Sequence, residues 1–172
     1  GQVRQQQGQP LAHHGGRPVV AHAVAWHNAQ GIAATEVCCL YATAPFIQAS
    51  DVQRGLEILQ SSGADYAFSV TTYAFPIQRA IRITPHQRVQ MFQPEHFNTR
   101  SQDLIEAWHD AGQFYWGNAQ AWVKHQPLFT ENATTVAIPR HRVQDIDTPE
   151  DWERAEWMFK SMKLSTKENH DI

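Results

Sequence analysis

The 172 residues of this chain suffice for one domain with a sizeable core, and their 42% hydrophobic and 18% charged content is typical of a globular protein. A formal net charge of −3, without any lysine or arginine tract, argues against a nucleic-acid-binding surface. No apolar run approaches the ~20 residues that span a bilayer, and the Gln-rich N-terminus has no secretory apolar segment. We therefore expect a cytoplasmic protein that has neither nucleic acid nor membrane as a partner.

The residue types that most often bind metals or form disulfides give only a weak signal here. Ten histidines are scattered along the chain without zinc-ligand spacing, so a histidine metal site is disfavoured. The only cysteines, Cys38 and Cys39, are neighbours in an apolar run. Neighbours in a strand point to opposite faces, which predicts two reduced core residues.

The first third of the chain predicts coil, helix and strand in that order. Residues 1–16 are rich in Gln and Gly and are expected to be disordered. From Pro18 onward the apolar spacing is helical, and Gly31 suits the end of that helix. The apolar run at residues 37–41 then predicts a strand that is buried on both faces of a parallel sheet.

A second helix is predicted to follow, with Ser50 as its N-cap, Gln53 at the capping-box position and Gly63 at its end. Residues 65–73 alternate as a strand whose Tyr66, Phe68 and Val70 share one face. Two short apolar runs around residues 85–87 predict a hairpin.

The remaining elements are shorter. Residues 113–116 predict a short aromatic strand, followed by a helix that Asn118 caps and that ends near Pro127. Residues 134–138 and 143–147 predict two more strands. Strands that alternate with helices predict an α/β fold, a three-layer sandwich around a mainly parallel sheet.

The last helix has the clearest start, because Thr148 suits the N-cap and Pro149 the first turn. Four residues at helical spacing predict a stripe of this helix that packs on the core: Trp152, Ala155, Phe159 and Met162. We expect a domain over residues 17–163 and a flexible tail over residues 164–172.

Asp145 and Asp147 are the sharpest candidates for chemistry. Two residues apart on a predicted strand, they would project to one face at its carboxyl end, where open α/β sheets bind ligands. Two carboxylates there can hold a hard cation such as Mg²⁺. A solvated aspartate pair in a strand-to-helix connection explains the same spacing equally well.

Other candidates are weaker on their own. Thr43 follows the first predicted strand, where a ligand or an ordinary turn could use it. Arg100 suits a carboxylate or phosphate, although a loop salt bridge is the simpler explanation. Tyr115 and its aromatic neighbours could line a sugar pocket or belong to the core. His109 is a conceivable but disfavoured general base.

Taken together, four segments in this order resemble the CMP-nonulosonate synthetases, cytidylyltransferases that act on nine-carbon α-keto acid sugars. The matching segments are Cys39 to Phe46, Arg100 to Leu104, Asp110 to Gly117 and Asp145 to Asp151. The segment from Asp110 to Gly117 resembles the pseudaminic acid branch, whereas the sialic acid branch has an Asn-Gly-Ala-like segment there. The resemblance covers residues 18–160.

The resemblance implies a Rossmann-like nucleotide-diphospho-sugar transferase fold and a homodimer that forms through a projecting hairpin. It implies transfer of CMP from CTP to the sugar acid with release of pyrophosphate. It assigns Mg²⁺ and catalysis to Asp145 and Asp147. Five residues are implied to bind substrate: Thr43, Arg100, Gln102, Gln113 and Tyr115.

The N-terminal residues depart from this pattern. The family begins with a strand and a Gly-rich basic loop that holds the CTP phosphates, and nothing before Arg17 matches either. We therefore expect an N-terminally incomplete domain that makes no CMP-sugar at an appreciable rate by itself. The alternatives are a sialic acid or 3-deoxy-manno-octulosonate cytidylyltransferase, or a non-catalytic member that folds or dimerises without CTP chemistry.

Overall fold

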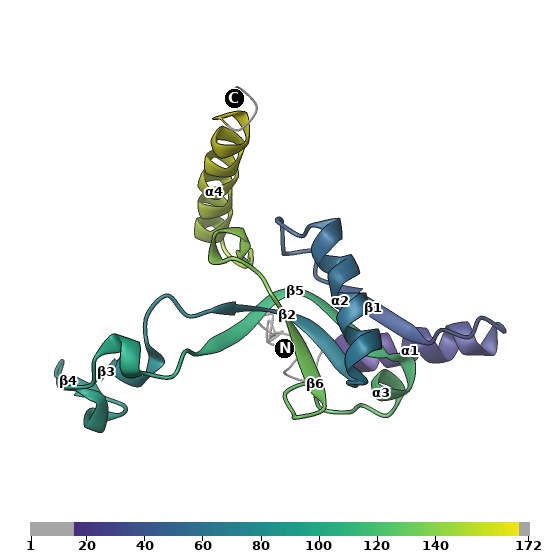
Figure 1. Cartoon of the computed structure of the whole chain (residues 1–172), viewed down its shortest axis with the longest axis horizontal. Helices are drawn as coiled ribbons and strands as arrows, with labels where there is room; N and C mark the ends of the chain where they lie inside the picture. Colours follow the sequence, from purple (N-terminus) through teal and green to yellow (C-terminus); the bar gives the residue numbers. More distant parts are fainter. Residues whose placement is uncertain (1–15, 169–172) are drawn as a thin grey trace, which may run out of the picture.

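A four-stranded mixed sheet organises the chain (Figure 1), whose computed structural model describes residues 16–168. The strands lie in the order β1 (Glu36–Leu40), β5 (Trp108–Asn118), β2 (Tyr66–Thr72) and β6 (Ala133–Ala137). Only the β2–β6 pairing is parallel, because β5 runs antiparallel to both of its neighbours. The α/β prediction is confirmed, but the expectation of a mainly parallel sheet is wrong for the described strands.

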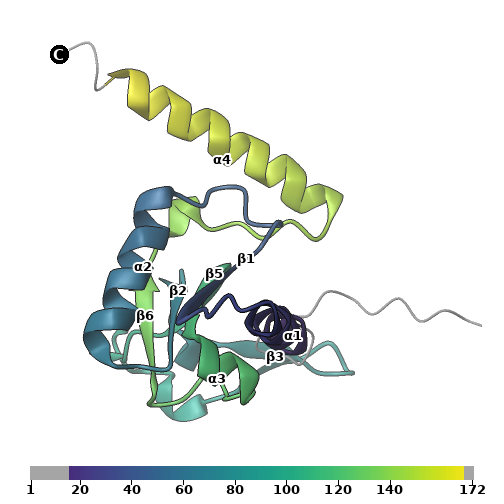
Figure 2. The same cartoon turned by 90° about the vertical axis from the view of Figure 1, so that its right-hand side faces the viewer.

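Helices cover both faces of this sheet and make three layers (Figure 2). Helix α2 (Ala49–Ser62) packs on β2, β5 and β6, whereas α1 (Gly16–Ala29) and α3 (Ala119–Val123) pack together on the opposite face. The turns that end α1 and α2 contain Gly31 and Gly63, as predicted, and both adopt positive φ angles of 80° and 69°. The predicted three-layer sandwich is therefore present.

The centre of the core lies where β2, β5 and α3 meet. Tyr66 and Trp122 are fully buried, with their rings edge to face at 5.0 Å. Gly117 permits this packing, since a Cβ atom there would lie 2.5 Å from Tyr66 Cδ1 and 2.6 Å from Trp122 Nε1. Strand β2 is buried on both faces rather than on the single face that its alternation predicted, because α2 and α3 cover it from opposite sides.

Strand β1 is less buried than its apolar sequence predicted. It pairs only with β5 among the described strands, and Leu40 is 55% exposed. Cys38 and Cys39 are free and pack on opposite faces, as predicted. Burial raises the pKa of Cys38 to about 12 and also raises that of Cys39, so both thiols stay protonated and unreactive at neutral pH.

Two predicted N-caps are wrong in detail. Helix α2 begins two residues earlier than predicted, with Gln48 at the N-cap position and no capping side chain, so Ser50 lies within its first turn. Asn118 stands at the N-cap of α3, but its amide donates to the Ala64 carbonyl at 3.0 Å instead of capping the helix. Helix α3 ends at Val123, well before Pro127.

An arm formed by residues 73–107 projects from the sheet between β2 and β5 (Figure 1). It carries the predicted hairpin, β3 (Ile81–Ile83) paired with β4 (Val89–Met91), together with the 3-10 turns Ile77–Arg79, Pro94–His96 and Ser101–Asp103. Its large apolar side chains are mostly exposed, up to 84% at Ile105. The arm therefore has almost no core of its own.

Helix α4 (Pro149–Glu168) extends away from the sheet (Figures 1 and 2). Of its predicted stripe only Ala155 is buried, whereas Trp152 is 59% and Phe159 is 49% exposed, so the packing prediction is wrong for the described chain. The strand predicted at residues 143–147 is also wrong: a 3-10 turn, Arg140–Arg142, and irregular backbone lead into α4 instead. Residues 16–168 include no helix long and apolar enough to cross a membrane.

Candidate active site

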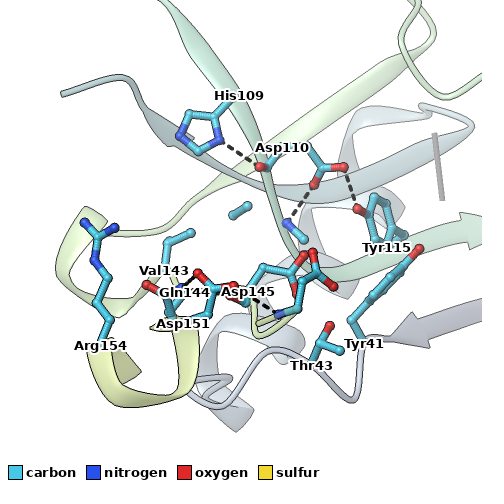
Figure 3. A pocket seen from close by; sticks show the side chains of 13 residues that line it. Tyr41, Thr43, His109, Asp110, Tyr115, Val143, Gln144, Asp145, Asp151 and Arg154 are labelled. Carbon is cyan, nitrogen blue, oxygen red and sulfur yellow. Dashed lines mark hydrogen bonds between the residues drawn. The ribbon is translucent and has the colours of Figure 1, made fainter. Parts of the chain in front are cut away.

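A cleft of about 630 Å³ opens where four segments meet: the turn after β1, the middle of β5, residues 143–147 and the start of α4 (Figure 3). Its walls carry both carboxylates and aromatic rings. The lining residues are Tyr41, Thr43, His109, Asp110, Ala111, Gly112, Tyr115, Val143, Gln144, Asp145, Asp147, Asp151 and Arg154.

A bulge in β5 shapes one wall of this cleft. Tyr115 pairs with Phe68 and Asp110 pairs with Val70, so residues 111–114 lie opposite Ser69 alone. The bulge removes the amides of residues 113 and 114 from regular pairing with β2. The fully buried Ser69 hydroxyl accepts hydrogen bonds from these two amides instead, at 3.1 and 3.2 Å. The bulge therefore brings together Asp110 and Tyr115, which a regular strand would hold apart.

Two donors hold the Asp110 carboxylate on this bulge (Figure 3). The Tyr115 hydroxyl donates to Oδ2 at 2.5 Å, and the Gly112 amide donates to Oδ1 at 2.8 Å. Gly112 adopts a φ of 63°, in the left-handed region that favours glycine, which turns its amide back toward Asp110. Each carboxylate oxygen thus has one fixed donor.

The opposite wall is the irregular segment that carries Asp145 and Asp147. The Ile146 amide donates to the Thr43 carbonyl at 3.2 Å, which ties this segment to the turn after β1. At its other end, Asp151 Oδ2 accepts from the amides of Asp147 and Thr148 at 3.3 and 2.9 Å. The two aspartates are therefore held by hydrogen bonds to their neighbours rather than by a strand.

The start of α4 matches its predicted capping pattern. The Asp151 amide donates to the Thr148 hydroxyl at 3.2 Å while that hydroxyl donates to Asp151 Oδ2 at 2.7 Å. The hydrogen bond from Thr148 is the main cause that lowers the pKa of Asp151. Asp151 is therefore a carboxylate over the whole neutral range.

Negative charge predominates in the cleft. Burial raises the pKa of Asp110, and the Asp145 carboxylate adds to this effect, whereas the hydrogen bonds from Tyr115 and Gly112 oppose it. Burial and the neighbouring Asp110 raise the pKa of Tyr115, so its hydroxyl keeps its proton at neutral pH. Arg154 is the one arginine or lysine among the lining residues, and its side chain has no partner in the described chain.

The cleft brings together five of the residues singled out from the sequence: Thr43, His109, Tyr115, Asp145 and Asp147. Arg100 and Gln102 lie elsewhere, on the arm, and the structure does not bring them to the cleft. The Arg100 guanidinium instead pairs with Asp103 at 2.8 Å. This is the loop salt bridge that the sequence offers as the simpler alternative to substrate binding.

The aromatic segment contributes less directly than the resemblance implied. Gln113 is fully buried, does not line the cleft, and donates its amide to the Arg142 carbonyl at 2.6 Å, so it supports the fold beneath the site. Tyr115 belongs to the cleft wall but is also fully buried, because Asp110 and Tyr41 lie around it. Tyr115 therefore contacts the site through Asp110.

Asp110 belongs to one of the four matching segments, but the sequence predicts no role for it. The available signal was the Asp-x-Gly spacing, which is typical of a turn in which the aspartate side chain accepts a hydrogen bond two residues ahead. His109 also lines the cleft, where its Nδ1 bonds the Asp110 carbonyl at 2.8 Å and its ring packs on Tyr73. The sequence pattern does not predict the bulge at residues 111–114, which brings His109 and Asp110 to the cleft.

The residues that face the cleft fit Mg²⁺ better than a softer metal. No group of three or more His, Cys, Asp or Glu side chains within residues 16–168 is arranged to hold a metal ion alone. Mg²⁺, however, keeps several waters and uses one or two carboxylates together with substrate phosphates. The hard oxygen donors of Asp145 and Asp147 satisfy that requirement.

The chain is similar to several known proteins. Over 142 residues, the chain is 37% identical to a pseudaminic acid cytidylyltransferase of Campylobacter jejuni subsp. jejuni serotype O:2, covering 83% of this chain and 61% of that protein. The protein of the same name from serotype O:23/36 is 39% identical over 72% of this chain and 53% of its own length. The chain thus spans somewhat over half the length of the curated relatives it matches.

A more distant relative is longer still. A Helicobacter pylori protein named pseudaminic acid cytidylyltransferase and UDP-2,4-diacetamido-2,4,6-trideoxy-beta-L-altropyranose hydrolase is 34% identical over 63% of this chain and 21% of that protein. A solved structure of CMP:2-keto-3-deoxy-manno-octonic acid synthetase complexed with CTP superposes with a TM-score of 0.56, at 12% identity, over 87% of this chain and 70% of the other. That likeness shows a shared fold. No protein-family model matches the chain.

Proposed function

This chain is related to the pseudaminic acid cytidylyltransferases of the CMP-nonulosonate synthetase family, and on that basis we propose that it supplies the sugar and metal side of a CMP transferase site. The reaction transfers CMP from CTP to pseudaminic acid and releases pyrophosphate. The observation that carries the proposal is the cleft that gathers Thr43, Asp145 and Asp147, three residues of the matching segments, beside the β5 bulge.

The chemistry proposed for the cleft follows from its charges. The anomeric hydroxyl of the sugar attacks the α-phosphorus of CTP, in line with the departing pyrophosphate. Mg²⁺, when bound, supplies positive charge next to the phosphate oxygens. Asp145 and Asp147 would hold that ion, while the hydrogen bonds of the Ile146 and Asp147 amides to Thr43 and Asp151 fix the backbone that carries them before the substrates arrive.

Arg154 is the residue of this cleft best suited to an anionic group of the substrates. It projects from α4 toward the cleft and has no competing partner in the described chain (Figure 3). Its planar guanidinium can bind a carboxylate or phosphate through two hydrogen bonds. We therefore propose that Arg154, rather than Arg100, binds the anionic group when the substrate is bound by a single chain.

We also propose that two copies associate through the arm. Several large apolar side chains on it are exposed, among them Phe75, Phe97 and Ile105 at 72–84%, which is unusual for a lone monomer. A second copy that covers them would also bring the arm, and with it Arg100, near another protein surface. Light scattering of the chain measures this directly: a dimer supports the proposal, and a monomer at every concentration contradicts it.

Metal binding tests the site within the chain as it stands. Mn²⁺, used as a paramagnetic substitute for Mg²⁺, should broaden the amide signals near Asp145 and Asp147 in an NMR spectrum. Asp147→Ala should abolish the broadening and remain folded. Glu57→Gln, an exposed residue of α2, is the matched control and should leave it unchanged. Equal broadening in the wild type and Asp147→Ala would remove the pair from the metal site.

Turnover tests the reaction itself. A chimera that adds to this chain the parts of the Campylobacter jejuni protein outside the match should release pyrophosphate from CTP in the presence of pseudaminic acid and Mg²⁺. In that chimera, Asp147→Ala should lower the rate by at least about a hundredfold. A chimera that prefers sialic acid would contradict the assigned sugar, and one that binds the sugar acid without any turnover would favour the non-catalytic alternative.

A further inference from the structure

The Asp110 carboxylate lines the cleft, but the reaction proposed above assigns no role to it. It is partly buried, it lines the cleft, and its two hydrogen bonds come from the protein behind it. Placing a carboxylate where burial disfavours its charge is costly unless donors compensate. The fold provides two such donors, one per oxygen.

Both donors are themselves fixed by the fold. Tyr115 is fully buried and stacks on Phe68 at 6.1 Å, so its hydroxyl has little freedom to turn elsewhere. The Gly112 amide belongs to the bulge whose following amides are bound by the buried Ser69 hydroxyl. This arrangement orients one carboxylate with two donors and leaves its remaining lone pairs for the cleft.

The Asp110 carboxylate lines the cleft, and its hydrogen bonds from Tyr115 and Gly112 hold it there. The Asp145 carboxylate lies near Asp110 and repels it, whereas the His109 side chain bonds the backbone carbonyl of Asp110 through Nδ1. A ligand in the cleft would therefore meet an acceptor at Asp110. The matching groups on a sugar acid are N–H and O–H donors.

We infer that Asp110 is a specificity-determining residue that accepts a hydrogen bond from an acylamino N–H of the bound sugar acid, with Tyr115 as its positioning residue. The inference rests on the proposed function, which makes the sugar an acylamino sugar acid. A carboxylate that can only accept favours a substrate with a donor at this point and disfavours one that offers only an acceptor.

Asp110→Asn is the sharpest variant, because it keeps the shape and changes the polarity. The asparagine can keep its Oδ1 on the Gly112 amide and turn its NH₂ group toward the Tyr115 hydroxyl, which can accept as well as donate, so the side chain presents an N–H donor where the carboxylate presents lone pairs. Tyr115→Phe removes one donor and leaves the carboxylate. Glu57→Gln is again the control, and thermal unfolding of each variant reports its folding.

Calorimetric binding of pseudaminic acid to the full chain is the measurement. We expect Asp110→Asn to weaken binding at least tenfold, Tyr115→Phe to weaken it several-fold, and the double variant to be no weaker than Asp110→Asn alone. The same substitution should change the affinity for 3-deoxy-manno-octulosonate, which has no acylamino group, by less than threefold. A merely structural role, or a hydrogen bond from a hydroxyl that both sugars carry, would weaken the binding of both sugars equally, and either result would overturn the inference.

A second measurement needs no variant. A pseudaminic acid analogue in which the acylamino groups are replaced by ester oxygens lacks the N–H donors, and the wild-type chain should bind it at least tenfold more weakly. Equal affinity for the two compounds overturns the inference. Loss of Mn²⁺ binding in Asp110→Asn, with sugar binding intact, also overturns it and makes Asp110 a metal ligand. A wild-type chain that binds no sugar acid at all contradicts both the proposed function and the inference. A chain that binds the sugar acid without depending on Asp110 contradicts the inference alone.

Discussion

The sheet and the arm use the same kinds of residue in opposite ways. In the sheet, Tyr66, Phe114 and Tyr115 are fully buried, and polar groups such as Ser69 are buried with partners. On the arm, Phe97 and Ile105 are 72% and 84% exposed, and the Arg100–Asp103 ion pair lies in solvent. The sheet therefore sets the geometry of the cleft, whereas the arm offers a surface to other molecules.

The largest effect should come from crowding the sheet. Gly117→Ala would place a Cβ atom within 2.6 Å of both Tyr66 and Trp122, whose buried rings have no space to move. We expect a loss of about 3 kcal/mol in the free energy of unfolding, measured by urea denaturation. Val19→Ala, at a 68% exposed position, should stay within about 0.5 kcal/mol of the wild type. Unchanged stability of Gly117→Ala would show that the core is looser than described.

Ion-paired aspartates in the sheet region and on the arm allow the same substitution to be compared in both regions. The Asp51 side chain, 5% exposed, pairs with Arg142 at 2.5 Å and with Arg54 at 3.0 Å, and so joins α2 to the segment that leads to the cleft. Asp51→Asn should lower the free energy of unfolding by about 3 kcal/mol, because Arg142 would remain largely buried and unpaired. Asp103→Asn on the arm should change it by less than about 1 kcal/mol. Equal effects of the two substitutions would contradict the contrast.

The cap of α4 should have a smaller and more local effect. Thr148→Ala removes the hydroxyl that bonds the Asp151 amide and carboxylate, and should cost about 1 kcal/mol of helix stability. Amide hydrogen exchange at the start of α4 measures this. The fold lowers the pKa of Asp151, so its carboxylate stabilises the folded chain at any pH above the pKa that Asp151 has in the unfolded chain. This stabilisation is lost as the pH falls through the pKa of Asp151 in the folded chain. Protection factors at the start of α4 that do not fall in acid would contradict the cap.

The smallest effect on folding is expected on the arm. Ile105→Ser should leave the stability of the isolated monomer within about 0.5 kcal/mol, since so little of this side chain is buried. The same change should weaken association of two copies if the arm forms the dimer. Dilute denaturation and light scattering separate the two effects. A large loss of monomer stability would show that the arm packs on the sheet.

What could be predicted from the sequence was local. Apolar spacing and turn residues correctly predicted α1, α2, the β3–β4 hairpin and the Thr148 cap. Strand direction was predicted wrongly, because the pairing of β5 with β1 and β2 depends on contacts between residues far apart in the sequence. A run such as residues 37–41 is equally apolar at the centre and at the edge of a sheet.

The site shows the same division. Asp145 and Asp147 reach the cleft as expected, although an irregular segment held by Thr43 and Asp151 positions them instead of a strand. Asp110 received no role, since its orientation depends on a bulge that Ser69 stabilises from another strand. Arg100 lies on the arm, which its motif does not reveal, and its role in substrate binding stays a prediction.

The central claim is that the cleft, and not the arm, binds the sugar acid within one chain. Titration of the ¹⁵N-labelled chain with pseudaminic acid, followed by amide chemical shifts, tests it most directly. We predict the largest shifts at the amide of Gly112, which bonds the Asp110 carboxylate, and at the amide of Ile146, which lies next to Asp145 and bonds the Thr43 carbonyl. Shifts confined to the arm around Arg100, with none at Gly112 or Ile146, would contradict it.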